Sequence, residues 1–151
     1  MKIWIDGDAC PKQIKDIIFR AAIKRKITTI LVANHFVTTP LSMFIKKVVV
    51  PAGFDAADQF IANHLVAQDL VITADIPLAD LVITKQAIAL NPRGELYSNQ
   101  NIKQVLAIRN LNESLRNNGL INGGVNKLNH KDIQNFSNNF DKILHNHRIK
   151  K

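Results

Sequence analysis

The sequence predicts an α/β fold in which a mostly parallel sheet of about five strands lies between layers of helices. Short aliphatic runs alternate along the chain with segments whose apolar residues recur at helical spacing, as in βαβ units. Apolar residues make up 46% of the chain but aromatic residues only 6%, a balance typical of Val/Ile/Leu-rich strands buried under helices. The length of 151 residues fits one domain.

The first strand is predicted at 2–5, because this apolar run stops abruptly at Asp6-Gly7-Asp8. Pro11 suits the first turn of a helix, and apolar residues at helical spacing extend that helix over 11–25. The same criteria predict further strands at 27–33, 48–50, 70–73 and 87–90, and helices at 41–45, 55–65 and 76–85.

A C-terminal helical extension is predicted over about 101–146. Its first helix covers 101–118 and is ended by Gly119, and 119–128 is expected to be a mobile connection. Asn129 can cap the last helix, which begins at His130 and has Asp132 in its favourable first turn. The tail from residue 147 is expected to be frayed.

Aspartates gather at the predicted strand ends. Right-handed crossovers place the carboxyl ends of parallel strands on one edge, where ligands bind in such folds. Five of the 12 acidic residues lie at or just beyond these ends: Asp6, Asp8, Asp55, Asp58 and Asp75. Carboxylates brought together repel one another unless a cation neutralises them, and such hard oxygen ligands suit Mg²⁺ or Mn²⁺. The sequence therefore predicts a metal site able to activate water against a phosphoester.

Each of these aspartates also has a purely structural interpretation. Asp55 could be a helix N-cap, and Asp58 a first-turn residue that complements the helix dipole. Asp8 is either a ligand or the N-cap of the helix that contains Pro11. Asp6 and Asp75 could simply end their strands in turns.

Other polar residues are candidates for substrate binding. Asn34 ends the second strand on the same edge, and Arg93 lies in a strand-end loop where it could grip a phosphate. Arg20 and Lys85 could also contact substrate, although each could equally be a solvated surface charge. Cys10 lies near a helix N-terminus, which is expected to depress its pKa.

The chain is basic, with a formal charge of +8 and a pI near 9.8. This charge makes a polyanionic partner such as nucleic acid plausible, although it could only solubilise the surface. Its single cysteine cannot form an intrachain disulfide, which fits a reducing compartment. The N-terminus lacks a signal-peptide pattern, and no apolar run approaches the roughly 20 residues of a membrane span. A cytoplasmic location is therefore expected.

Four motifs carry a family resemblance. The segments IDGDACP, VPAGFDAADQFIANH, DLVITADIPLA and ALNPRGELY occur in this order. Together with the ending NHKDIQNFSNNFDKIL, they closely resemble the uncharacterised bacterial YaiI/YqxD family (UPF0178, DUF188). The resemblance covers nearly the whole chain. It brings no established activity with it.

The fold that this resemblance implies is similar to the PIN-like and NYN-like nucleases. Those proteins place aspartates at the end of the first strand, on a following helix, and after a hydrophobic strand in a T-x-D or S-x-D turn. Asp6 matches the first, Asp55 or Asp58 the second, and Thr73-Ala74-Asp75 the third. The resemblance thus implies a metal-dependent hydrolase, a nuclease that acts on RNA.

Two other functions remain open. The Asp6-Gly7-Asp8 segment is similar to the D-x-D start of haloacid dehalogenase-like phosphatases, in which the first aspartate is a nucleophile and the second a general acid. Those enzymes usually have a threonine shortly afterwards, where Cys10 and Pro11 stand here. The chain could also be a non-catalytic RNA-binding protein, since its basic surface fits binding as well as catalysis.

Overall fold

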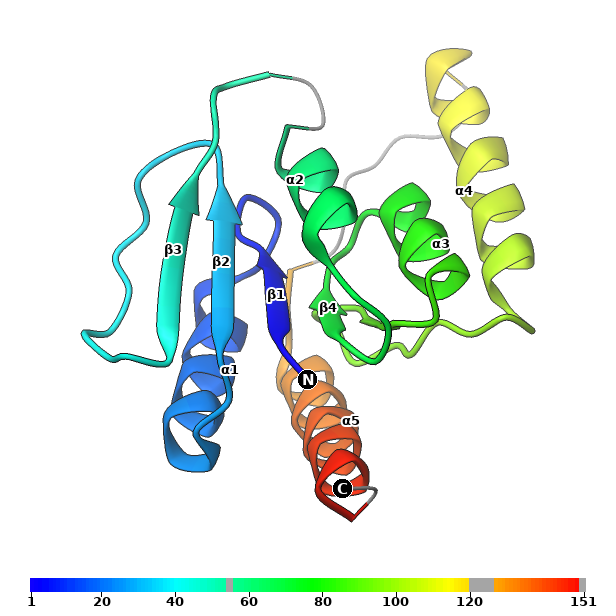
Figure 1. Cartoon of the computed structure of the whole chain (residues 1–151). Coiled ribbons are helices and arrows are strands. Elements are labelled where there is room, and N and C mark those ends of the chain that lie inside the picture. The colour runs from blue at the N-terminus through cyan, green and yellow to red at the C-terminus, as the bar shows by residue number, and fades with distance from the viewer. Residues whose placement is uncertain (54–55, 120–126, 150–151) are drawn as a thin grey trace.

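A central parallel sheet organises the molecule (Figure 1). The computed structural model describes residues 1–53, 56–119 and 127–149. Five strands pair in the order β3-β2-β1-β4-β5, and every pairing is parallel. The strands are β1 (Ile3–Asp6), β2 (Thr29–Ala33), β3 (Ile45–Val49), β4 (Leu70–Ile72) and β5 (Ile88–Leu90). The predicted α/β fold with a mostly parallel sheet is confirmed.

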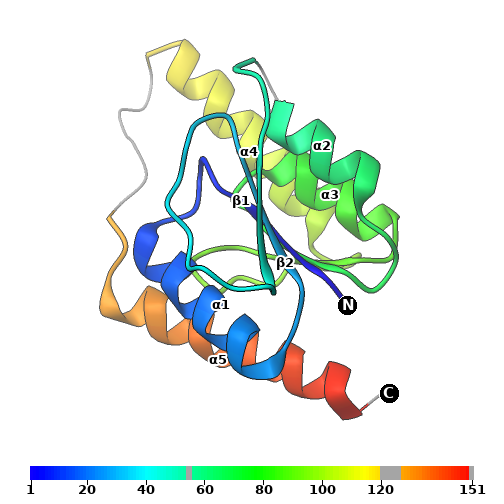
Figure 2. The same ribbon diagram turned by 60° about the vertical axis from the view of Figure 1, so that its left-hand side comes forward.

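Helices cover both faces of this sheet, as Figure 2 shows. One face carries α1 (Lys12–Arg25) and α5 (His130–Ile149). The other carries α2 (Ala56–His64), α3 (Ile76–Thr84) and α4 (Ile102–Asn117). The result is the three-layer arrangement with C-terminal helices that the sequence predicts.

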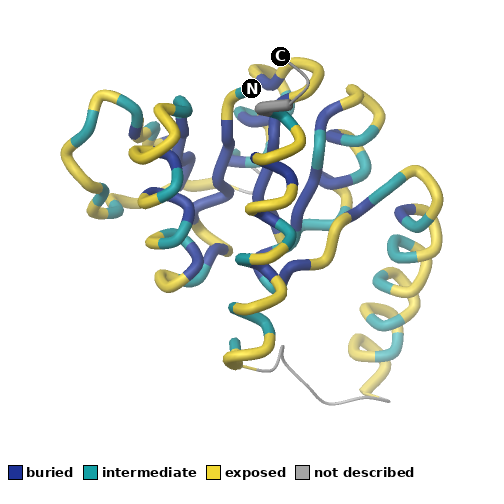
Figure 3. Tube along the Cα trace, turned by 90° about the horizontal axis from the view of Figure 1, so that it is seen from below, coloured by how far each residue is buried: buried dark blue, intermediate teal, exposed yellow. Residues whose placement is uncertain are grey.

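The core follows the alternation of side chains along β1. Ile3 and Ile5 pack under α1 and α5, whereas Trp4 points to α2 and α3. Because helices cover both faces, β1, β2 and β4 are buried along their whole length, which is why they are continuous apolar runs in the sequence. Phe136 and Phe140 stack at a centroid distance of 5.2 Å and anchor α5 to the sheet. Figure 3 shows the burial concentrated in this central layer.

The region before β3 departs from the prediction. No helix forms at 41–45; residues 41–44 form bends and turns, and β3 begins at Ile45 instead of 48. The reason is that β3 is an edge strand whose exposed Lys46 and Lys47 interrupt the apolar run. Charged residues on an edge strand are a common protection against pairing with other chains.

The predicted ends of the C-terminal helices are largely confirmed. Asn129 Oδ1 accepts a hydrogen bond from the Asp132 N–H at 2.8 Å, and Asp132 Oδ2 accepts one from the Asn129 N–H at 3.2 Å. Gly119 follows α4 with a left-handed φ of 72°. The tail prediction was wrong for residues 147–149, which continue α5, and most of the connection predicted at 119–128 lies outside the described residues. None of the described helices combines the length and the apolar character that crossing a membrane requires.

Candidate functional site at the carboxyl ends of the strands

The strand order creates a switch point between β1 and β4. From β1 the chain builds outward through β2 to β3, and then it returns to add β4 and β5 on the other side of β1. Crevices at such switch points, outside the carboxyl ends, are the usual ligand sites of open parallel sheets. A pocket of about 330 Å³ lies here. Its polar lining consists of Asp6, Asp8, Asn34, Asp58 and Asp75.

The structure therefore brings together four of the five predicted aspartates and the predicted asparagine. The fifth, Asp55, lies outside the described residues. Asp58 stands in the first turn of α2 and also lines the pocket, so its two interpretations are compatible. Small residues, among them Gly53, Ala57 and Ala74, complete the wall.

Asp6 is the last residue of β1 and is only 5% exposed. Burial raises the pKa of its carboxyl group to about 6, and the nearby charges of Asp75 and Asp8 add to the increase. The Thr73 hydroxyl donates to Asp6 Oδ2 at 3.2 Å and lowers the pKa, but burial outweighs it. Burial and the two neighbouring carboxylates therefore disfavour the ionised form of Asp6.

The turn after β4 places Asp75 next to Asp6. Thr73 Oγ1 accepts a hydrogen bond from the Asp75 N–H at 2.9 Å while its hydroxyl donates to Asp6. Asp75 Oδ1 accepts from the Leu78 N–H at 2.8 Å, so Asp75 is also the N-cap of α3. An N-cap engages one carboxylate oxygen, and Asp75 still lines the pocket. Thr73 thus links Asp6 and Asp75.

Asp8 is held by the end of β2. Gly7 permits this approach, because its N–H donates to Val32 O at 2.8 Å and a Cβ there would stand 2.8 Å from Leu31 Cδ1. Both Asp8 oxygens lie 3.1 Å from the Asn34 N–H, and His35 Nδ1 is 2.9 Å from Asp8 Oδ1. The N-cap prediction for Asp8 was wrong, since the N-cap position of α1 is Pro11.

The three predicted cationic contacts do not line this pocket. Arg93 Nη1 lies 2.6 Å from Asp132 Oδ2 and so connects its loop to the start of α5. The Lys85 ammonium donates to the Ala62 carbonyl of α2. Arg20 is exposed on α1. Arg93 and Lys85 thus contact segments 39 and 23 positions away in the sequence, which their local sequence does not reveal.

The side chains of Cys10 and His64 are held by packing contacts outside the acidic pocket. The expected depression of the Cys10 pKa was wrong, because burial raises it to about 12. The thiol packs in the core between the sheet and α1. His64 stacks on Phe60 at a centroid distance of 4.1 Å, and its Nδ1 lies 2.8 Å from the Phe60 carbonyl oxygen.

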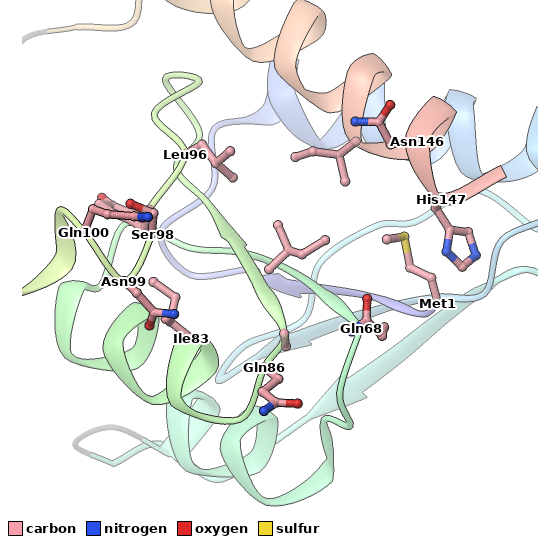
Figure 4. A pocket seen from close by; sticks show the side chains of 14 residues that line it. Met1, Gln68, Ile83, Gln86, Leu96, Ser98, Asn99, Gln100, Asn146 and His147 are labelled. Atoms are coloured by element: carbon pink, nitrogen blue, oxygen red, sulfur yellow. The ribbon is translucent and has the colours of Figure 1, made fainter. Parts of the chain in front are cut away.

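A larger cavity of about 760 Å³ lies at the opposite ends of the strands. Figure 4 shows Met1 next to His147 of α5, with Asn146 on the same helix and with Gln68 and Gln86 farther from α5. No Asp, Glu, Lys or Arg side chain occurs among the described residues that line it. Its described lining thus lacks the carboxylates with which a hard divalent cation is usually bound.

The donor set of the acidic pocket fits a hard divalent cation. Carboxylate and amide oxygens from Asp6, Asp75 and Asn34 are the ligand type that Mg²⁺ and Mn²⁺ prefer. In the described ranges, however, no three His, Cys, Asp or Glu side chains form a group that could already hold a metal ion. The chemistry of the donors fits, and their side chains would have to move together on binding.

These features define a three-layer α/β protein with an acidic pocket at the switch point of a parallel sheet. Residues 4–146 match the model of DUF188, described as an uncharacterised YaiI/YqxD family. The chain belongs to this family, as its motifs predict.

Its relatives are similar along almost their whole length. A UPF0178 protein of Legionella pneumophila (strain Philadelphia 1) is 55% identical over 144 residues, which cover 95% of this chain and 97% of the relative. UPF0178 proteins of Maridesulfovibrio salexigens and Colwellia psychrerythraea are 52% and 54% identical, and the alignments cover 95% of each chain. No solved structure matches the chain. The PIN-like or NYN-like placement therefore stays a prediction.

Proposed function

We propose that this protein is a metal-dependent phosphodiesterase that cleaves nucleic acid, with RNA as the substrate. The observation that carries the proposal is the convergence of Asp6, Asp58 and Asp75 from three separate elements on one pocket at the switch point. Asp8 joins them from the loop after β1. Four carboxylates in a pocket of about 330 Å³ favour a cation as their partner.

Asp6, Asp58 and Asp75 would hold Mg²⁺ or Mn²⁺. When bound, such an ion supplies Lewis acidity and neutralises charge on a reacting phosphate. Thr73 orients the Asp6 carboxylate and fixes the turn that presents Asp75. His35, whose Nδ1 lies 2.9 Å from Asp8 Oδ1, follows the pocket residue Asn34 and would donate a proton to the leaving oxygen.

Electrostatics supports a polyanionic substrate. The chain carries a formal charge of +8 although four of its aspartates line the pocket. Basic side chains elsewhere would attract the phosphate backbone. The arrangement favours a phosphatase less: both Asp8 oxygens accept from the Asn34 N–H and one lies 2.9 Å from His35 Nδ1, so both are already engaged, whereas a general acid must carry a proton on one of them.

The test is cleavage of end-labelled RNA and DNA in Mg²⁺, Mn²⁺ or EDTA. Asp6→Asn and Asp75→Asn should each lower the cleavage rate at least about 100-fold, since even residues that only support metal ligands have effects of this order. Asp80→Asn is the matched control, because Asp80 lies on α3 outside the pocket and pairs with Lys103 at 3.1 Å. Its rate should stay within about twofold of wild type.

Three outcomes would overturn the proposal. The wild type could be inactive on all substrates, or both pocket variants could cleave as fast as wild type, which would indicate a contaminating nuclease. Phosphate trapped covalently on Asp6 during hydrolysis of a phosphomonoester would replace the proposal with the phosphatase mechanism.

A further inference from the structure

Phe36 is a large aromatic side chain that the fold leaves in solvent. It is 71% exposed, and the other phenylalanines in the described ranges are buried or half-buried. The Nζ atom of Lys47 lies 4.0 Å from the centroid of its ring. This cation–π contact holds the ring against β3, so that it does not fold into the core.

The backbone of Phe36 lies close to the lining of the acidic pocket. Phe36 follows Asn34, which lines the pocket, by two residues, a distance of at most about 7 Å along the chain. Asn34 and His35 are themselves fixed by Asp8, through the Asn34 N–H at 3.1 Å and His35 Nδ1 at 2.9 Å. The position of Phe36 is therefore coupled to the site.

The surroundings of the ring are cationic. Lys46 and Lys47 are both exposed on β3, which is the edge strand of the sheet. In the register with β2, Lys46 pairs with Ile30 and Lys47 with Leu31, so their side chains point to opposite faces of the sheet, and it is Lys47 that contacts the Phe36 ring. The charged residues lining the pocket are aspartates, so a phosphate chain that passes from the pocket to Phe36 would meet an aromatic face and the Lys47 ammonium.

We propose that Phe36 forms a stacking platform for one unpaired base of a single-stranded nucleic acid, with Lys47 contacting its backbone. Exposed aromatic faces beside cations bind single strands in this way, and bases inside a duplex cannot reach such a face. The inference rests on the proposed function and narrows its substrate to single strands. It places the preference for unpaired bases in the connection between β2 and β3.

The test measures binding in EDTA, so that cleavage does not interfere. Fluorescence anisotropy would compare a labelled 12-nucleotide single-stranded RNA with the same sequence in a duplex. Phe36→Ala should weaken single-strand binding about tenfold or more, the order of one stacked base, and should leave duplex binding unchanged. Phe36→Tyr should restore single-strand binding to within about threefold of wild type, because it keeps the aromatic face.

Matched variants separate stacking from other roles of an exposed apolar residue. Phe36→Leu keeps apolar bulk without a flat π-face and should behave like Phe36→Ala. Met43→Ala removes an 82% exposed side chain from the same connection and should bind like wild type. Thermal melting should show that all variants are folded, since both positions are exposed.

Several results would overturn the platform. Phe36→Ala could bind single strands as tightly as wild type, or Phe36→Leu could bind like wild type, which would indicate simple apolar contact. A switch from dimer to monomer in Phe36→Ala would identify the ring as a contact between copies of this chain.

The platform and the proposed function can fail separately. Binding that depends on Phe36 without any cleavage would retain the platform and refute the nuclease. Cleavage that depends on Asp75, together with single-strand binding that does not depend on Phe36, would retain the nuclease and refute the platform.

Discussion

Two aspartates at opposite ends of the same parallel sheet are both buried, yet their surroundings differ. Asp69, at the amino ends, is 2% exposed and accepts hydrogen bonds at 3.0 Å from the Lys2 N–H, the Trp4 indole and the Val66 N–H. Asp6, at the carboxyl ends, is 5% exposed and faces the carboxylates of Asp75 and Asp8. Burial alone therefore does not identify a functional carboxylate; the balance between donors and like charges does.

The cavities at the two ends show the same contrast. The larger one, at the amino ends, has no Asp, Glu, Lys or Arg among its described lining residues, whereas the smaller one gathers four aspartates. The larger volume favours the first cavity as a binding site, whereas the carboxylates favour the second as a cation site. Removal of a buried carboxylate should therefore chiefly destabilise the fold at the amino end, whereas at the carboxyl end it should chiefly weaken ligand binding, with smaller or opposite effects on stability.

The largest expected effect on stability is that of Asp69→Ala. The substitution leaves three N–H donors without their acceptor in a buried place, and we expect a loss of about 3 kcal/mol or more in the free energy of unfolding. Urea denaturation measures it, with Asp80→Ala as the exposed control expected within about 0.5 kcal/mol. A loss below about 1 kcal/mol would show that Asp69 does not have the structural role assigned to it.

Asp6→Asn should instead increase the free energy of unfolding. The pKa of Asp6 in the folded protein is about 6, above its ordinary value of 3.8, so the folded state binds the proton more tightly than the unfolded state. Wild-type stability should therefore fall as the pH rises from about 4 through 6. In EDTA at pH 8, Asp6→Asn should raise the free energy of unfolding by about 3 kcal/mol.

This gain should vanish below pH 4, where wild-type Asp6 is protonated in both states. Urea denaturation at pH 4, 6 and 8 measures the dependence. Equal stability of wild type and Asp6→Asn across this range would contradict the electrostatic contrast between the two ends.

Substitutions of Asp75 should have the smallest effect on stability. They also separate its role as the N-cap of α3 from its role in the pocket. Asp75→Ala should lower the free energy of unfolding by about 1 kcal/mol, because it removes the N-cap of α3. Asp75→Asn should cost little, because asparagine caps as well as aspartate. Both variants should remove the Asp75 charge from the pocket and should lose the nuclease activity. If Asp75→Asn kept full activity, the carboxylate would serve only as a cap.

The sequence predicts the carboxyl end of the sheet well. Asp6 and Asp75 follow uninterrupted apolar runs, so their strands and their shared edge follow from simple periodicity and crossover handedness. Asn34 could be placed in the same way. The family resemblance adds the match of Asp58, and the structure brings that residue to the same pocket.

The rest depends on contacts between distant segments. Asp69 looks like a turn residue before a strand, and its partner Trp4 is 65 positions away. Arg93 and Asp132 are 39 positions apart, so no local pattern could reveal their pairing. The start of β3 was missed because Lys46 and Lys47 on an edge strand break the apolar run.

Calorimetric titration with Mn²⁺ at pH 7 measures directly whether the acidic pocket binds a cation. We expect the wild type and Asp80→Asn to bind the ion, and Asp6→Asn and Asp75→Asn each to weaken binding at least about tenfold. Asp69→Asn serves as the buried control at the amino end, and wherever it is folded it should bind like wild type. Absence of binding by the wild type at millimolar Mn²⁺, or equal binding by all four variants, would contradict a cation site at the carboxyl ends of β1 and β4.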